Sequence, residues 1–481
     1  MSENLRKETV KGVAWSAVDR FANTGIQLVA NVVLARLLSP DDFGLIAMIA
    51  IFIQIAQVFI DSGFTNALIQ KKDRNQVDYS TVFYFNLGIS IILYILLFFS
   101  APYIAMFFDS PKLESLTRVV GINLIIGALA AVHRTKLTIE LKFKHQSLIT
   151  LVAASISATI SIIMAYKGLG VWSLVIMSLL NIFIQTILFY SWIRWMPSLI
   201  FSKQSFRHLF SYSSKILGAS IIHLLYRNLY PIAIGKRYAA TELGYYNRAD
   251  TFSMYPATIM SSVVSRVAFP VFSKIQDDND KLRYAYRKYI KFASIFIFPV
   301  MLGIIALAKP FTIVVLTEKW LPMVIMLQIL CFDWAADHIN QINLNILFVK
   351  GRSDLALRLE IIKKSIAVII LLISLVGDII WVCWGRVIYG MIALFINTHY
   401  TKKLIGISRL DQVKDFLIPL MASVMMCICV LLLNYFIISP LIQFCVGIVF
   451  GIIIYVLFSI ILMPSEVREL RSIAMSTFFN K

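Results

Sequence analysis

Residues 34–44 of this 481-residue chain read LARLLSPDDFG, and residues 234–244 read IGKRYAATELG. Both stretches lie between two long apolar runs. They carry the same kind of residue at the same offsets, namely Arg36 and Lys236, Asp42 and Glu242, Phe43 and Leu243, and Gly44 and Gly244. A pattern repeated in this way indicates that the chain consists of two related halves. The nature of the apolar runs then decides the fold.

The composition is that of a membrane protein. Hydrophobic residues make up 59% of the chain and charged residues 15%, whereas soluble proteins carry roughly 25% charged residues. Runs such as 82–99 and 422–438 approach the ~20 apolar residues that cross a bilayer as a helix. We therefore predict an all-α polytopic membrane protein with about fourteen transmembrane helices. They are expected over residues 12–35, 43–69, 79–101, 113–133, 146–166, 170–193, 209–235, 244–272, 289–308, 321–349, 357–377, 379–400, 412–438 and 441–463.

The distribution of positive charge predicts the orientation. Most of the 45 Lys and Arg residues fall in segments that are cytoplasmic if the N-terminus lies inside the cell. Cytoplasmic loops are enriched in these residues, so both termini are predicted to be cytoplasmic. The net charge of +19 is then explained by contact with anionic lipid, and no nucleic-acid partner is expected. Residues 277–291 are predicted to form an amphipathic helix on the cytoplasmic interface, with a solvated linker helix as the alternative.

The two quoted stretches fall at equivalent places, in the external turn after an odd-numbered span. Ser39 is expected to cap a helix that starts at Pro40, with Asp42 as the acid of a capping box. Thr241 and Glu242 are expected to cap the start of the eighth span in the same way, but more weakly. The alternative is that any helical turn outside a membrane needs such caps.

Six spans separate the two copies, and an even number preserves chain direction. This spacing predicts parallel repeats related by an axis along the membrane normal, as in some transporters. The expected organisation is an N-terminal lobe over 1–200, a C-terminal lobe over 201–403, and two extra helices with a cytoplasmic tail over 404–481.

Four stretches in colinear order, LLSPDDFGLIAM, DSGFTNALIQKKD, LGYYNRAD and FPVFSKIQDD, resemble signature stretches of the polysaccharide transporter family. These are the Wzx-like flippases of the multidrug/oligosaccharidyl-lipid/polysaccharide exporter superfamily. The resemblance extends from about Lys11 to the last spans. It implies movement of an undecaprenyl-diphosphate-linked oligosaccharide across the bacterial inner membrane, for exopolysaccharide, capsule or lipopolysaccharide assembly. It also implies two lobes around a cavity that opens to alternate sides, with a polysaccharide polymerase and export machinery as partners.

Polar residues form stripes along spans 1, 2, 7, 8 and 10, and a charge inside a bilayer is costly unless it faces protein or water. One shared polar cavity between the lobes is therefore predicted. Arginine offers a planar fork for a diphosphate, and amides and tyrosine suit sugar hydroxyls. The predicted substrate-binding residues are Arg227, Arg20, Arg248, Arg266, Asn23, Gln27, Gln57 and Tyr255. The predicted ion-coupling residues are Asp19, Asp61, Asp333, Asp337 and His223.

Several of these assignments have a structural alternative. Arg248 with Asp250, and Asp19 with Arg20, could form local ion pairs. Asp333 and Asp337 could hold helices together. Arg266 could reach the cytoplasmic interface, and His223 could be a core histidine.

Motifs of several other functions are absent from the sequence. There is no Gly-x-x-x-x-Gly-Lys-[Ser/Thr] nucleotide-binding loop, no dinucleotide fingerprint and no metal-ligand spacing, so no cofactor or metal is expected. A drug or small-solute exporter of the same superfamily is the second hypothesis. A membrane polysaccharide polymerase or glycosyltransferase is the third, and it is less favoured because the connections are too short for a catalytic domain.

Overall fold

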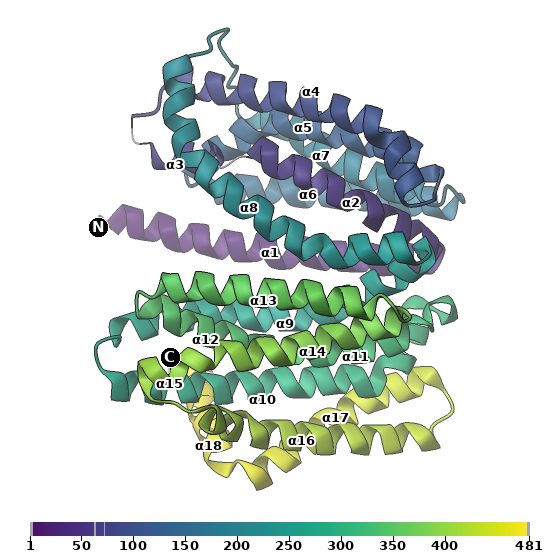
Figure 1. Ribbon diagram of the computed structural model, residues 1–481, viewed down its shortest axis with the longest axis vertical. Coiled ribbons are helices and arrows are strands. Elements are labelled where there is room, and N and C mark those ends of the chain that lie inside the picture. Colours follow the sequence, from purple (N-terminus) through teal and green to yellow (C-terminus); the bar gives the residue numbers. More distant parts are fainter. Residues whose placement is uncertain (1–2, 62–63, 72, 479–481) are drawn as a thin grey trace. The chain divides into compact units, whose positions relative to one another are not determined.

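The computed structural model describes residues 3–61, 64–71 and 73–478, and every regular element in these ranges is helical (Figure 1). The chain forms two compact units, Met1–Gly244 and Tyr245–Lys481. Unit 1 contains α1 (Glu3–Leu37), α2 (Pro40–Asp61), α3 (Phe64–Gln70), α4 (Gln76–Phe107), α5 (Lys112–Ile139), α6 (Phe143–Tyr166), α7 (Trp172–Trp192), α8 (Lys203–Arg237) and the first turn of α9 (Ala240–Lys274).

Unit 2 continues from the second turn of α9. Its further helices are α10 (Asn279–Phe311), α11 (Met323–Ala335), α12 (Asp337–Val349), α13 (Ser353–Ser374), α14 (Ile379–Asn397), α15 (His399–Ile405), α16 (Arg409–Phe436), α17 (Pro440–Leu462) and α18 (Pro464–Phe478). Two short helices, η1 (Thr312–Leu316) and η2 (Glu318–Trp320), follow α10.

Within the described ranges, nine helical stretches are long and apolar enough to cross a membrane. They are Pro40–Ile60, Gln76–Phe107, Lys112–Ile139, Phe143–Tyr166, Trp172–Trp192, Asn279–Leu316, Ile379–Ile405, Arg409–Phe436 and Pro440–Leu462. The prediction of a helical, multi-pass membrane protein is confirmed. The remaining predicted spans lie on helices that are more polar or are interrupted, and their crossing of the membrane stays a prediction.

Two predicted spans are not continuous helices. The segment 43–69 divides into α2, which ends at Asp61, and the short α3, while residues 62 and 63 lie outside the described ranges. The segment 321–349 is interrupted at Ala336, where α11 ends and α12 begins at Asp337. An acidic residue in the first turn of a helix is favoured by the helix dipole, so Asp337 suits a new start at this point.

The predicted interfacial helix over 277–291 is also different in the structure. Its capping by acidic residues is confirmed, because the Asp278 carboxylate accepts hydrogen bonds from the backbone N–H groups of Asp280 and Lys281. The helix does not end after the basic residues, however. It runs on without a break as α10, so these residues form the first turns of a helix that is long enough to span the membrane.

The repeated stretches of the sequence start α2 and α9. At the first copy, Ser39 Oγ donates to Asp42 Oδ2 at 2.7 Å and the backbone N–H of Asp42 donates back to Ser39 Oγ at 3.2 Å. The predicted capping box and the start at Pro40 are therefore confirmed. At the second copy α9 already begins at Ala240, so Thr241 lies inside the first turn and is not the cap.

The glycines of the two copies meet each other within unit 1. A β-carbon on Gly44 would lie 1.7 Å from the carbonyl oxygen of Ala240, and one on Gly244 would lie 2.0 Å from the carbonyl oxygen of Pro40. Any side chain at either position would overlap backbone. The glycine repeated in the sequence is thus explained by a reciprocal close crossing of the first turns of α2 and α9.

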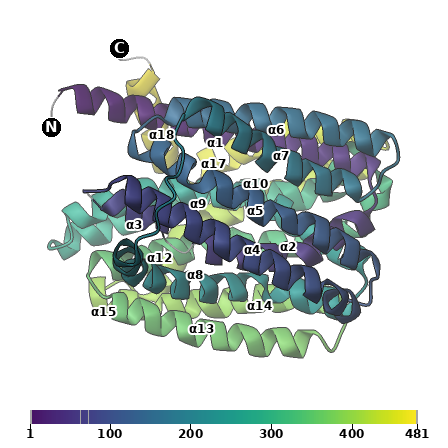
Figure 2. The ribbon, with the colours of Figure 1, turned by 90° about the horizontal axis from the view of Figure 1, so that it is seen from above.

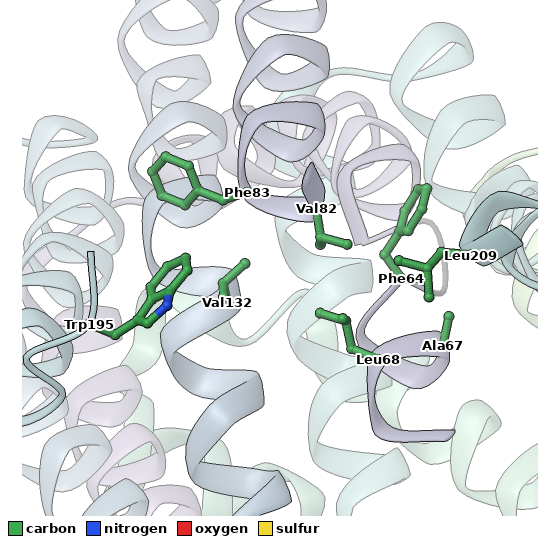
Figure 3. Packing of buried hydrophobic residues seen from close by; sticks show 8 residues of the cluster. All are labelled: Phe64, Ala67, Leu68, Val82, Phe83, Val132, Trp195 and Leu209. Carbon is green, nitrogen blue, oxygen red and sulfur yellow. The ribbon is translucent and has the colours of Figure 1, made fainter. Parts of the chain in front are cut away.

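One hydrophobic cluster of unit 1 is formed where α3, α4, α5 and α8 meet the segment after α7. Figure 3 shows Phe64 and Leu68 of α3 packed with Val82, Phe83, Val132, Ala67, Trp195 and Leu209. Trp195 is also held by polar contacts, since its Nε1 donates to Gln76 Oε1 at 2.6 Å and its carbonyl oxygen lies 3.1 Å from His133 Nε2. On another side of the unit α1 runs beside α6 (Figure 1 and Figure 2).

The boundary between the units differs from the predicted boundary between lobes. Helix α8 packs on α2, α3 and α4 and so belongs to unit 1, whereas the repeat pattern groups it with the helices that follow. The two units are defined by contacts, whereas the predicted lobes are defined by the sequence repeat, so the units do not test the lobes. The division into lobes over 1–200 and 201–403 stays a prediction.

Candidate functional site

A polar cavity of about 510 Å³ lies inside unit 1 between four helices. It is lined by Gln27 and Asn31 of α1, Ile53 and Gln57 of α2, Asn123, Gly127, Ala130 and Arg134 of α5, and Leu174, Met177, Ser178, Asn181, Ile182, Gln185 and Phe189 of α7. Among the described residues that line it, Arg134 is the single charged one, and none is acidic. The rest of the polar lining consists of amide groups and one hydroxyl.

These helices present polar residues to the cavity at helical spacing. On α5 the lining residues recur every three or four positions from Asn123 to Arg134, and on α7 they do so from Leu174 to Phe189. This spacing places them on one face of each helix. Gly127 lets α5 approach α7, since a β-carbon there would lie 2.9 Å from Ile182 Cδ1.

Hydrogen bonds fix several of the lining side chains. Asn123 Nδ2 donates to Ser178 Oγ at 3.0 Å, and Gln185 Nε2 donates to Asn181 Oδ1 at 2.6 Å. Asn181 Nδ2 in turn donates to Ser157 Oγ of α6 at 3.3 Å. A ligand in the cavity would therefore meet amide groups whose orientation is already set.

Unit 2 contains a different polar site, a charge cluster made of Asp250, Asp333 and Arg386 together with Tyr246 and Trp334. Arg386 Nη2 lies 2.6 Å from Asp333 Oδ2, and Arg386 Nη1 lies 2.7 Å from Asp250 Oδ1. The side chains of Arg386 and Asp333 are 14% and 15% exposed. The cluster joins α9, α11 and α14 by ion pairs that are largely removed from solvent.

The aromatic members complete the charge cluster. Arg386 Nη1 donates to the Tyr246 hydroxyl at 2.8 Å, and Trp334 Nε1 donates to Asp250 Oδ1 at 3.0 Å. The Arg386 guanidinium also lies 5.7 Å from the centre of the Trp334 ring, which is within cation–π range. All the charged groups of the cluster thus have partners inside unit 2.

Two polar residues of α12, Asn343 and His338, form hydrogen bonds within unit 2. Asn343 Oδ1 accepts hydrogen bonds from the Tyr286 hydroxyl at 2.8 Å and the Thr401 hydroxyl at 2.6 Å, and Asn343 Nδ2 donates to Gln412 Oε1 at 3.1 Å. The buried His338 lies 2.9 Å from Ser294 Oγ through its Nε2. These side chains hold helices together.

Comparison with protein families gives a match over residues 33–325 to the family described as "Polysaccharide biosynthesis protein". This match covers more than half of the chain. The chain belongs to this family.

Two relatives identified by sequence comparison agree with this membership. The lipopolysaccharide biosynthesis protein WzxC of Escherichia coli is 27% identical over 362 residues, which cover 75% of this chain and 74% of that protein. The teichuronic acid biosynthesis protein TuaB of Bacillus subtilis is 27% identical over 355 residues, which cover 73% and 74% of the two chains.

The fold is shared with known transporters. A structure described as the lipid II flippase MurJ in an inward closed conformation matches with a TM-score of 0.75 at 19% identity, over 95% of this chain and 100% of that one. An inward-facing multidrug resistance MATE transporter of the MOP superfamily matches with a TM-score of 0.58 at 16% identity, over 79% and 95%. The member of the polysaccharide biosynthesis family described here is therefore a multi-pass membrane protein with this transporter fold.

The structure brings together part of the predicted site. Gln27 and Gln57 both line the cavity of unit 1, and Asn23 is half-buried one turn before Gln27 on α1. Arg248 and Tyr255 are half-buried on the part of α9 that belongs to unit 2. Six predicted residues have side chains outside the described part of the structure, namely Asp19, Arg20, Asp61, His223, Arg227 and Arg266.

Two of the structural alternatives can be compared with the contacts. Asp250 forms an ion pair with Arg386 of α14. Asp333 joins α11 to α14 through Arg386, as expected of a residue that holds helices together, while Asp337 is half-buried at the start of α12.

Several residues of the two polar sites were missed by the sequence analysis. They are Asn123, Arg134, Ser178, Asn181 and Gln185 in the cavity, and Arg386 in the charge cluster. Arg134 was assigned to a cytoplasmic connection because the fourth span was ended at residue 133, whereas α5 continues to Ile139. The spacing of Ser178, Asn181 and Gln185 along one helical face was a signal that could have been found.

Proposed function

We propose that this protein flips an oligosaccharide carried on undecaprenyl diphosphate across the bacterial inner membrane, for the assembly of a surface polysaccharide. Membership of the polysaccharide biosynthesis family supports this proposal. So do the names of relatives that act in lipopolysaccharide and teichuronic acid biosynthesis, and of a succinoglycan biosynthesis transport protein of Rhizobium meliloti. The fold shared with a lipid II flippase is consistent with it.

The observation that carries the proposal is the chemistry of the cavity in unit 1. A membrane protein that moves an apolar compound needs no wall of amides, and a polar group inside a bilayer is retained where it has a function or a partner. Five amide side chains on α1, α2 and α7, together with Asn123 and Ser178, offer both donors and acceptors. A sugar head group has the matching hydroxyls.

A drug or small-solute exporter remains the second candidate, because the fold is also that of a multidrug resistance transporter. The lining of the cavity disfavours a cationic drug. Arg134 would repel a cation, and the described lining residues include no carboxylate to attract one. An anionic or neutral polar cargo fits this lining better.

The roles of individual residues follow from the same proposal. The diphosphate is assigned to the predicted arginines, with Arg227 first because it lies well inside its helix, together with Arg20, Arg248 and Arg266. Coupling to an ion is assigned to Asp333 and Asp337, with Asp19, Asp61 and His223 as further members of the set. The charge cluster supports this assignment, since two carboxylates share one guanidinium and leave a formal negative charge that a cation could compensate.

The proposed topology has both termini in the cytoplasm and two six-helix lobes, 1–200 and 201–403, that provide access to the two sides in turn. A polysaccharide polymerase and export machinery are the proposed partners. Asp42→Cys and Glu242→Cys should both react with an impermeant thiol reagent added outside the cell. Reaction of either cysteine from the cytoplasmic side alone would contradict this topology.

The function itself is tested in reconstituted vesicles. Lipid-linked oligosaccharide is placed in the inner leaflet, and its appearance outside is measured with a sugar-binding lectin. The native protein should expose the sugar, Arg227→Ala should fail to do so, and Arg227→Lys should be partly active because a point charge replaces a bidentate fork.

A matched control is Arg352→Ala, which removes an exposed arginine that pairs with Asp354 at 2.8 Å. This variant should flip at the native rate. If the native protein exposed no sugar, the proposed function would be wrong. If Arg227→Ala flipped normally, Arg227 would be removed from the site and the function would stand.

A further inference from the structure

The wall of the unit 1 cavity formed by Asn123 of α5 with Ser178, Asn181 and Gln185 of α7 is here called the amide wall. We infer that the amide wall recognises the sugar of the head group and not its diphosphate, and so determines which saccharide is accepted. This inference rests on the proposed function.

The orientation of the Asn123 amide is fixed by its neighbours. Ser178 Oγ uses its proton to donate to the carbonyl oxygen of Val175 at 2.8 Å. It must therefore accept in its contact with Asn123, so the Asn123 atom at 3.0 Å is the NH₂ group. The amide oxygen Oδ1 of Asn123 points elsewhere. It is buried in a residue that is 9% exposed, and it accepts no hydrogen bond from the described residues.

The same reasoning fixes the amides further along α7. Ser157 Oγ donates to the carbonyl oxygen of Ala154 at 3.1 Å, so it accepts from the NH₂ group of Asn181. Asn181 Oδ1 then accepts from the NH₂ group of Gln185 at 2.6 Å. In this series of hydrogen bonds, the Oε1 atom of Gln185 is the amide oxygen that is not used, and it is again an acceptor.

Two acceptor oxygens held in this way select the chemical class of the ligand. The oxygen of Asn123 is a buried acceptor without a donor, which is costly, while Gln185 is half-buried. A ligand that brings donors is therefore favoured at this wall. A saccharide carries O–H groups around its rings. A diphosphate at neutral pH carries acceptor oxygens and negative charge, which carbonyl oxygens repel, and a prenyl chain has no polar group at all.

The position of Arg134, the single cation among the described lining residues, agrees with this assignment. Arg134 lies three turns further along the same face of α5 than Asn123, which is about 16 Å at 1.5 Å per residue. The guanidinium of Arg134 is therefore at the other end of the cavity from Asn123. The cavity is polarised, with acceptors for hydroxyl groups at one end and a guanidinium at the other.

The test compares the binding of two lipids to the full-length protein in nanodiscs. One is the undecaprenyl-diphosphate-linked oligosaccharide extracted from the native cells, and the other is undecaprenyl diphosphate without sugar. The native protein should prefer the sugar-bearing lipid. The double variant Asn123→Leu with Gln185→Leu should bind this lipid about tenfold or more weakly, and should bind undecaprenyl diphosphate as the native protein does.

The control is Phe183→Leu, which changes a side chain on α7 that is 48% exposed and lies outside the cavity lining. It should leave both affinities unchanged. If the double variant does not fold, Met177→Trp replaces it, because a larger side chain fills the cavity without removing a hydrogen bond of the wall. This variant should weaken binding of the sugar-bearing lipid selectively.

Two results would overturn the inference, and they can be told apart. A folded variant that keeps the native preference for the sugar-bearing lipid would exclude the amide wall as the sugar site and leave the proposed function intact. A native protein that shows no affinity for either lipid would remove the proposed function, and the inference with it.

Discussion

The cavity of unit 1 and the charge cluster of unit 2 are both polar sites inside bundles of apolar helices, but they use their polar groups differently. In the charge cluster, Arg386 faces Asp333 and Asp250 at 2.6 and 2.7 Å, so that each charged group has an oppositely charged partner. In the cavity, the polar side chains are mainly neutral amides, and the buried Oδ1 of Asn123 accepts no hydrogen bond from the described residues.

This difference separates two reasons for placing polar groups within a membrane. Ion pairs between helices fix a particular packing, because breaking one leaves an unpaired charge away from water. Neutral amides can line a space that must be entered and left, since a ligand can replace water there at a modest cost. We therefore expect changes in the charge cluster to affect stability first, and changes in the cavity to affect binding and transport first.

The largest effect is expected for Arg386→Met. It leaves the carboxylates of Asp250 and Asp333 unpaired in a site that is largely removed from solvent, which typically costs about 3–5 kcal/mol. The melting temperature of the purified protein in detergent should fall strongly, and the yield of folded protein should fall with it.

Two further variants make this prediction specific. Adding Asp250→Asn and Asp333→Asn to Arg386→Met removes the unpaired charges and should recover most of the lost stability. Arg352→Ala, at an exposed ion pair of the same unit, should leave the melting temperature almost unchanged. A small effect of Arg386→Met alone would mean that the cluster is open to water and does not hold its three helices together.

A smaller loss is expected at the crossing of the repeated stretches, where unit 1 depends on packing and not on charge. Gly44→Ala places a β-carbon 1.7 Å from the carbonyl oxygen of Ala240, so the first turns of α2 and α9 must move apart. Overpacking of this kind typically costs about 1–3 kcal/mol, and contact with backbone favours the upper end. Thermal unfolding in detergent measures the loss.

The control for this substitution lies in the same unit. A β-carbon on Gly88, in the interior of α4, would meet no heavy atom within 4 Å. Gly88→Ala should therefore stabilise the protein by roughly 0.5–1 kcal/mol, because alanine is the better helix former. If Gly44→Ala and Gly88→Ala changed the stability equally, the helices α2 and α9 would be packed less tightly at their crossing than the 1.7 Å distance implies.

The sequence predicted the parts of the fold that depend on local patterns. Long apolar runs predicted membrane helices, and Ser39, Pro40 and Asp42 predicted a capped start that the structure has in detail. The matching glycines at 44 and 244 indicated a repeat. Their contact with each other could not be predicted, because it depends on how two segments two hundred residues apart are placed.

The candidate site was predicted less completely for the same reason. Gln27 and Gln57 were found because each lies in a polar stripe. Asn181 and Gln185 also share a helical face with Ser178, but their contacts with α5 and α6 depend on the tertiary structure. Arg386 has no acidic residue near it on its own helix, and its partners lie on α9 and α11. The sequence shows that a charge within an apolar helix is costly. It does not show which residue of another helix is its partner.

The smallest expected effect concerns ion pairs at the edge of unit 2, which sharpen the contrast with its buried cluster. Glu466 and Glu469 of α18 pair with Lys291 and Lys288 of α10. Burial raises the pKa of Glu466, but the hydrogen bonds from Lys291 and Ser465 outweigh it and hold the pKa below its usual value. Because the folded pKa is lowered, the stabilisation is present above the pKa of the unfolded chain, near ~4.3. It is lost as the pH falls through the folded pKa.

Glu466→Gln tests this dependence directly. At pH 7 the variant should be less stable by roughly 0.2–1 kcal/mol, the range of partly exposed ion pairs. As the pH falls below 4, protonation of Glu466 removes the same interaction from the native protein, so the two melting temperatures should converge. A difference that stayed constant from pH 7 to pH 3 would assign the effect of Glu466 to packing of α18, and its pairing with Lys291 would then contribute nothing measurable.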